Sequence, residues 1–150
     1  MIENKHSNNS HETLEPLFNP RSIAILGASK SEYKIGNLQV KALLDGHFNG
    51  EIYPINRKAK EIEGIKCYES LSDVPNEIDL AIFCLGANQV QQGLEECARK
   101  KVKAAIIFAA GFSETGKEGI KQQELLTDIA RKNGIRIVGP NCVGLVNLSN

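Results

Sequence analysis

Two short, uninterrupted apolar runs, Leu80–Cys84 and Ala104–Phe108, constrain the fold of this chain more than any other feature. A half-exposed strand alternates apolar and polar residues, whereas a strand buried on both faces is apolar throughout. Strands of the second kind occur in parallel sheets whose two faces are covered by helices. The two runs therefore predict a parallel sheet inside an α/β domain.

Amphipathic stretches alternate with the apolar runs, as crossover helices between parallel strands require. We expect strands at residues 22–26, 51–55, 79–84, 103–108 and 135–138. We expect helices at about 35–45, 88–101 and 117–133, with one helical turn at 71–74. The predicted fold class is α/β, a Rossmann-like doubly wound parallel sheet with helices on both faces.

Apolar residues at helical spacing mark the faces of these helices. On the first helix, nearby faces carry Ile35, Leu38, Ala42 and Leu43. The second helix is expected to bury one stripe, made of Val90, Leu94, Cys97 and Ala98. The third is expected to turn inward Leu125, Leu126, Ile129 and Ala130. Gly46 and Gly134 follow two of the helices and are expected to end them.

Composition and charge limit the class of protein to which this chain can belong. Residues 1–15 are polar, and we expect a flexible leader before a domain of residues 16–150 that forms the N-terminal part of a longer protein. No apolar run approaches the roughly 20 residues of a membrane span, and the leader contains no apolar segment of a secretory signal. The 18 basic and 18 acidic residues balance, so overall charge attracts neither nucleic acid nor a membrane. Four separated cysteines without a C-x-x-C pair favour reduced thiols and a cytoplasmic location over disulfides or zinc.

The turn Gly27-Ala28-Ser29 directly follows the first expected strand and leads toward a helix. Small residues let the backbone approach a ligand, and a helix N-terminus offers N–H groups and positive dipole charge to an anion. The turn therefore predicts a phosphate-bearing ligand. Gly27 does not begin a G-x-G-x-x-G pattern, which argues against an ordinary dinucleotide site.

Ligands of open parallel sheets bind beyond the carboxyl ends of the strands, where the strand order reverses. One such loop could be only a tight connection, but small or glycine-bearing loops follow four of the five expected strands, which favours a cleft. The expected cofactor-binding residues are Gly27, Ala28, Ser29, Lys34, Gly36, Asn56, Lys58, Leu85, Gly86, Ala109, Ala110, Gly111 and Asn141.

The loop after the second strand, Asn56-Arg57-Lys58, carries two cations where an NAD site carries an acidic residue. Two cations suit a ribose that bears a phosphate, as in NADP or coenzyme A. The alternative is a solvated basic turn without a ligand.

We expect neither a catalytic residue nor a metal ligand in this chain. His6 and His11 fall in the leader, and His47 lies in a turn at the opposite edge of the sheet from the ligand loops. Common nucleophile and metal-site motifs are absent. Cys142 follows Asn141 at the expected cleft, where it could lie near the reactive end of a ligand or simply fill space.

An ordered set of segments carries a family resemblance from about residue 17 onward. The segments are Phe18–Ser29, Lys34–Gly36, Ile52–Asn56 with Lys58, Ala110–Phe112 with Glu114, and Gly139–Cys142 with Gly144. Together they resemble the coenzyme A-binding domain of the nucleoside-diphosphate-forming acyl-CoA synthetases. This group includes ADP-forming acetate–CoA ligase and the succinyl-CoA ligase alpha subunit. Two loops depart from the family pattern, because Leu85 and Arg57 stand where the family usually has proline.

The resemblance implies a role for each loop. Residues 29–34 would hold the pyrophosphate and Lys58 the phosphorylated ribose. Ala109–Gly111 would pass the pantetheine arm by backbone contact, and Asn141 would lie near its thiol.

The resemblance also implies a coenzyme A-holding piece of an ADP-forming acid–thiol ligase. In that family, acid and ATP form an acyl phosphate, coenzyme A takes the acyl group, and phosphate passes to ADP through a phosphohistidine. The histidine, the ATP and ADP site and its Mg would belong to further domains or a beta subunit. The alternatives are a stand-alone coenzyme A- or nucleotide-binding regulatory module, or an NADP-dependent oxidoreductase domain.

Overall fold

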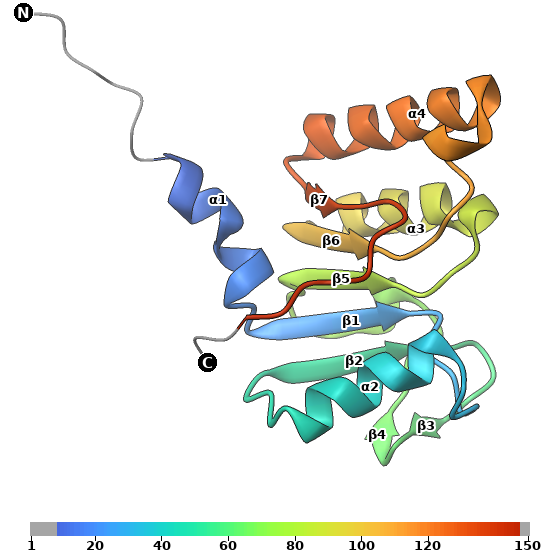
Figure 1. Ribbon diagram of the computed structural model, residues 1–150. Helices are drawn as coiled ribbons and strands as arrows, with labels where there is room; N and C mark the ends of the chain where they lie inside the picture. Colours follow the sequence, from blue (N-terminus) through green and yellow to red (C-terminus); the bar gives the residue numbers. More distant parts are fainter. Residues whose placement is uncertain (1–8, 148–150) are drawn as a thin grey trace, which may run out of the picture.

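The computed structural model describes residues 9–147. In this part of the chain, five parallel strands form one sheet in the order β2-β1-β5-β6-β7 (Figure 1). The strands are β1 (Ser22–Leu26), β2 (Glu51–Ile55), β5 (Leu80–Phe83), β6 (Ala104–Ile107) and β7 (Arg136–Val138). The predicted α/β fold with a Rossmann-like parallel sheet is confirmed.

Helices cover both faces of the sheet. The elements are α1 (Asn9–Phe18), α2 (Ile35–Asp45), α3 (Ala87–Arg99), α4 (Lys117–Asn133) and the 3-10 turns η1 (Leu71–Asp73) and η2 (Ser113–Thr115). In Figure 1, α2 and residues 139–147 cross the near face of the sheet, whereas α3 lies behind it. A small antiparallel hairpin, β3 (Glu61–Ile62) and β4 (Ile65–Lys66), follows β2.

The core consists of two layers, because successive strand residues point to opposite faces. In β5, Ala81 and Phe83 pack toward α3 and α4, whereas Leu80 and Ile82 pack toward α1 and α2. All four residues are buried, and the same is true of the four residues of β6. The uninterrupted apolar runs therefore reflect burial on both faces.

Helix α1 was not predicted. Residues 1–8 of the expected leader lie outside the described residues, but residues 9–15 belong to α1. Pro16 lies inside this helix, which lowers its helix propensity, and Leu17 is buried against the sheet. The β3–β4 hairpin was also missed, because strands of two residues leave no periodic pattern.

The predicted helix faces are confirmed in part. The α3 stripe is correct, since Val90, Leu94 and Cys97 are fully buried. The prediction for α4 is wrong at Leu125, which is 43% exposed. Helix α2 turns Gly36, Asn37 and Val40 toward the sheet and leaves Ile35 and Leu38 exposed.

A buried carboxylate ties the amino ends of three strands together. Asp79 accepts hydrogen bonds from the Arg21 N–H at 2.9 Å, from Arg21 Nε at 3.3 Å and from Lys103 Nζ at 2.8 Å. These residues precede β5, β1 and β6 respectively. Burial raises the pKa of Asp79, but the hydrogen bonds from Lys103 and Arg21 outweigh it and hold the net pKa below its ordinary value.

We expect Asp79→Asn to lower the free energy of unfolding by about 1–3 kcal/mol at neutral pH, since it removes the charge that Lys103 and Arg21 meet. A carboxyl group with a depressed folded-state pKa stabilises the fold above its unfolded pKa of about 3.9, and this stabilisation is lost as pH falls. Urea unfolding at neutral and acidic pH should therefore show the difference between wild type and variant shrinking below about pH 4. A difference that is unchanged with pH would contradict this account.

Candidate functional site

The strand order places a topological switch between β1 and β5. From β1 the chain passes to α2 on one face of the sheet, and from β5 to α3 on the other. The two connections diverge, which leaves a crevice beyond the carboxyl ends of β1 and β5. The loop Gly27–Lys34 and the loop Cys84–Gly86 flank this crevice, as the sequence predicted.

Two glycines allow the main chain to pack closely at the crevice. A Cβ atom on Gly27, whose φ is +81°, would lie 2.5 Å from the Cys84 carbonyl oxygen. A Cβ atom on Gly36, in the first turn of α2, would lie 2.1 Å from the Gly27 carbonyl oxygen. Glycine at both positions therefore lets α2 begin directly against the turn after β1.

Two asparagines hold the carbonyl groups of that turn. Asn56 Nδ2 donates to the Ala28 carbonyl oxygen at 2.7 Å, and Asn37 Nδ2 donates to the Ser29 carbonyl oxygen at 3.0 Å. Asn56 Oδ1 also accepts from the N–H groups of Lys58 and Ala59, both at 2.8 Å. The side chain of Asn56 is therefore engaged within the protein.

Asn37 was missed by sequence reasoning. It is fully buried, although it lies in a helix where a polar residue is usually taken as exposed. The available signal was its position between Gly36 and Val40, one helical turn apart, which both face the sheet.

Two helix N-termini border the crevice. Helix α2 begins after Lys34 and α3 after Gly86, and neither has a side-chain cap or an acidic residue in its first turn among the described residues. The first N–H groups of a helix have no partner within it and carry partial positive charge. Both helix ends are thus suited to an anionic ligand.

A cavity of about 300 Å³ opens between the loop after β2 and α3. Four predicted residues line it, namely Gly27, Asn56, Lys58 and Leu85. The other lining residues are Leu26, Ile55, Arg57, Glu69, Ser70, Gln89, Gln92, Gly93 and Glu96. The glutamines and Glu96 were not predicted, because one polar face of α3 looks like an ordinary solvent face.

The remaining predicted residues lie at the same edge of the sheet but outside this cavity. Ala109–Gly111 follow β6, and Asn141 follows β7 and donates its backbone N–H to the Ala109 carbonyl oxygen at 2.9 Å. Glu114 accepts from the Gly111 N–H at 2.7 Å and from the Phe112 N–H at 3.2 Å. The hydrogen bond from Gly111 is the main reason that the pKa of Glu114 is lowered.

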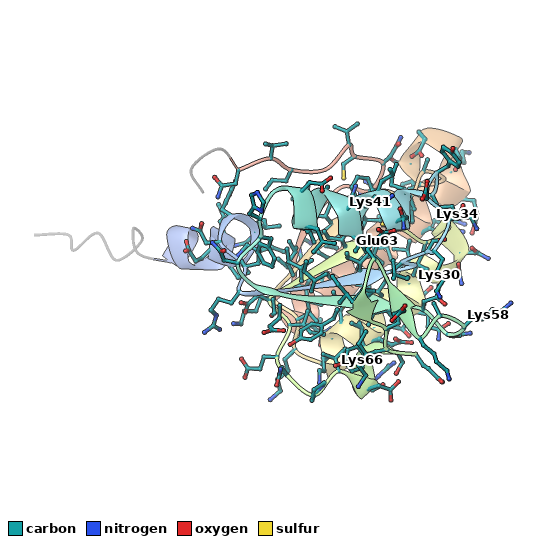
Figure 2. The ribbon with its side chains drawn as sticks, turned by 90° about the horizontal axis from the view of Figure 1, so that it is seen from below. Lys30, Lys34, Lys41, Lys58, Glu63 and Lys66 are labelled. Atoms are coloured by element: carbon teal, nitrogen blue, oxygen red, sulfur yellow. The ribbon has the colours of Figure 1, made fainter. Side chains whose placement is uncertain are left out.

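Three lysines lie at this edge of the sheet. Figure 2 shows Lys30, Lys34 and Lys58 toward the edge at which the parallel strands end. Lys41 lies beside Glu63 instead, with Nζ and Oε1 3.9 Å apart. Lys30 and Lys34 border the turn after β1, and Lys58 borders the cavity.

The four cysteines are free. Burial raises the pKa of Cys67 and Cys97 and raises the pKa of Cys84 to about 12, so these thiols stay protonated at neutral pH. Cys142 Sγ lies 3.4 Å from the Ile107 carbonyl oxygen, to which it donates.

Among the side chains that the structure describes, those of residues 14–147, no group of three His, Cys, Asp or Glu is placed to hold a metal ion. The helices described here are also too short or too polar to cross a membrane.

This chain is similar to several known proteins. The family model described as "CoA binding domain" matches residues 21–147. The chain is 45% identical over 134 residues to acetate–CoA ligase (ADP-forming) II subunit alpha of Pyrococcus furiosus, covering 89% of this chain and 29% of that protein. It is 50% identical over 128 residues to acetate–CoA ligase (ADP-forming) of Methanocaldococcus jannaschii, covering 85% and 18%.

Solved structures of similar proteins share the fold of this chain. The dinucleotide-forming acetyl-coenzyme A synthetase 1 of Ca. Korarchaeum cryptofilum, in complex with phosphate and ADP, superimposes with a TM-score of 0.84 at 40% identity. The match covers 87% of this chain and 28% of that one. This chain therefore spans less than a third of the length of these relatives. The fold also occurs in a hypothetical protein from Pyrococcus horikoshii, with a TM-score of 0.69 at 23% identity. That match covers 95% of this chain and 92% of the other.

Gly27→Ala and Gly64→Ala form a matched pair that tests the close packing at the crevice. Both glycines have a φ near +80°, but a Cβ atom on Gly64 meets nothing within 4 Å. We expect Gly64→Ala to cost about 1 kcal/mol of backbone strain. Gly27→Ala should cost more than about 3 kcal/mol, because it adds the overlap with Cys84. Urea unfolding measures both, and equal losses would show that packing against Cys84 is not required.

Proposed function

Since this chain belongs to the CoA-binding-domain family, as found in ADP-forming acetate–CoA ligases, we propose that it binds coenzyme A along the carboxyl edge of its sheet. The observation that carries the proposal is the crevice between β1 and β5, which two helix N-termini without side-chain caps border and where Lys34 directly precedes α2. A diphosphate bridging this crevice would meet N–H groups and cations at the same time.

The β1–α2 loop is the proposed site of the diphosphate. Gly27, Ala28 and Ser29 bring the main chain close, Gly36 sets α2 against them, and Lys34 lies directly before the first turn of α2. Positive dipole charge at this helix end, together with the lysine, favours two linked phosphate groups.

The cavity beside α3 is the proposed site of the adenosine end. Lys58 and Arg57 line it together with Glu69 and Glu96, and the two cations are the proposed contacts of a phosphorylated ribose. Leu85 lines the same cavity, and Gly86 precedes the first turn of α3. Asn56 is proposed to connect the loop after β2 to the turn after β1 and not to contact the ligand. Its side chain already forms hydrogen bonds with Ala28, Lys58 and Ala59.

The pantetheine arm is proposed to continue along the sheet edge toward β7. Ala109, Ala110 and Gly111 offer main-chain groups next in line, and Glu114 holds that loop by two N–H groups. Asn141, whose N–H already binds Ala109, would stand near the thiol end. The arm itself is uncharged, which suits a loop of small residues.

The whole protein is proposed to be an ADP-forming acid–CoA ligase of the cytoplasm, in which this domain presents coenzyme A. The matched region covers only 29% and 18% of the two ligases named above, and the first of them is designated subunit alpha. Acyl phosphate formation, the phosphohistidine and the binding of ATP, ADP and Mg would belong to further domains or a beta subunit. A stand-alone coenzyme A-binding module would use the same site without turnover.

Lys58→Ala should weaken coenzyme A binding about five- to tenfold, or roughly 1 kcal/mol, because one cation facing the ribose phosphate is lost. Binding of 3′-dephospho-coenzyme A should be nearly unchanged by the same substitution. Isothermal titration calorimetry of both ligands makes the comparison. Lys132→Ala on α4 is the control and should leave both affinities as in wild type. Equal weakening of both ligands would remove Lys58 from the ribose phosphate site.

Ligand selectivity and lack of turnover test the proposal as a whole. Coenzyme A at a hundred times its dissociation constant should stabilise the chain by about 2.7 kcal/mol in thermal unfolding, whereas NAD and NADP should have little effect. The purified chain with acetate, ATP and coenzyme A should consume no thiol. Stabilisation by NADP in place of coenzyme A, or thiol consumption by the chain alone, would overturn this assignment.

A further inference from the structure

The turn after β1 is held by an unusual pair of contacts. Asn56 and Asn37 reach it from different elements and bind the carbonyl oxygens of two consecutive residues, Ala28 and Ser29. Asn56 follows β2, whereas Asn37 lies in the first turn of α2. Each carbonyl oxygen is therefore fixed by a side chain before any ligand is bound.

Fixing a carbonyl group also fixes the N–H group of the next residue. In a planar trans peptide the C=O and N–H bonds point in opposite directions. Hydrogen bonds to the Ala28 and Ser29 oxygens therefore direct the N–H groups of Ser29 and Lys30 away from the two asparagines. Neither N–H group donates to another residue of the described chain.

Asn37 is itself held in one orientation. Its Nδ2 donates both to the Ser29 carbonyl oxygen at 3.0 Å and to Glu63 Oε1 at 2.8 Å. The reverse orientation of the amide would set its oxygen against two other oxygens, so the assignment is chemically required. Glu63 belongs to the turn between β3 and β4, and Lys41 lies 3.9 Å from the same carboxylate oxygen (Figure 2).

Stability alone does not account for this asparagine. Asn37 is fully buried, and its Oδ1 is a buried oxygen without a hydrogen-bond partner among the described residues. Such an oxygen costs free energy, so a residue that brings it into the core needs a compensating role. The hydrogen bond from Asn37 to the Ser29 carbonyl oxygen can provide this role.

We propose that Asn37, held by Glu63, is a positioning residue that aims the Lys30 N–H group at the diphosphate of coenzyme A, next to the Ser29 N–H group that Asn56 directs. This inference rests on the function proposed above and adds the β3–β4 turn as a support of the site. The carboxylate binds no ligand; it keeps the amide of Asn37 in place, and Lys41 partly balances its charge. The loop is thereby organised in advance, which reduces the ordering required on binding.

Three substitutions test the inference by calorimetry with coenzyme A and with pantetheine, which lacks the diphosphate. Asn37→Ala and Glu63→Ala should each weaken coenzyme A binding at least tenfold and leave pantetheine binding as in wild type. Glu63→Gln keeps an acceptor oxygen for Asn37 and should retain most of the affinity. The amide NMR shift of Lys30 should respond to coenzyme A in wild type and much less in Asn37→Ala.

Asn133→Ala is the matched control, because Asn133 Nδ2 donates to the Ile129 carbonyl oxygen at 2.8 Å on α4. It loses a side-chain bond to a carbonyl group far from the loop and should bind coenzyme A like wild type. If Asn37→Ala does not fold, Glu63→Ala in the turn decides the question. Wild-type affinity in Glu63→Ala and Asn37→Ala would overturn the positioning role alone. A wild-type chain that binds no coenzyme A would overturn the proposed function and this inference together.

Discussion

The contact between the start of α2 and the turn after β1 is the constraint on which the rest of the site depends. No side chain separates Gly36 from the Gly27 carbonyl oxygen, and none separates Gly27 from Cys84. Because the main chains are this close, the N-terminus of α2 stands at the crevice rather than a side-chain layer away. Asn37 and Asn56 can reach the turn for the same reason. Removing this contact would separate the helix dipole from the loop that it supports.

The same close contact explains the face that α2 presents to the sheet. A helix whose first turn packs a glycine directly against another main chain cannot also bury large side chains there. Gly36, Asn37 and Val40 therefore face inward, while Ile35 and Leu38 remain exposed. The first turn of α2 therefore buries few side-chain atoms but lies close to the turn after β1. On this side of the sheet, α1 and Leu145, in the segment after β7, complete the core.

Sequence reasoning recovered the sheet because burial on both faces leaves uninterrupted apolar runs, and strand bounds agree to within a residue. It also located the loops of the crevice, since parallel strands bring their carboxyl ends to one edge. It missed α1, whose Pro16 and polar composition hide its helical character. It also missed Asn37, Gln89 and Gln92, because a polar residue on a helix carries no sign of what it faces. Only the three-dimensional arrangement shows that Asn37 is buried and that the glutamines line a cavity.

The two edges of the sheet differ in whether their polar groups have partners within the protein. At the amino edge, Asp79 meets the Arg21 N–H and two side-chain cations, so the charges are satisfied within the protein. At the carboxyl edge, the N–H groups of Ser29 and Lys30 have no partner among the described residues, and the first turns of α2 and α3 have no side-chain cap. N–H groups and cations without partners lower the free energy of unfolding relative to paired ones. An anion that binds only the folded chain would offset this loss. The amino edge therefore stabilises the sheet, and the carboxyl edge retains the groups that the proposed ligand would meet.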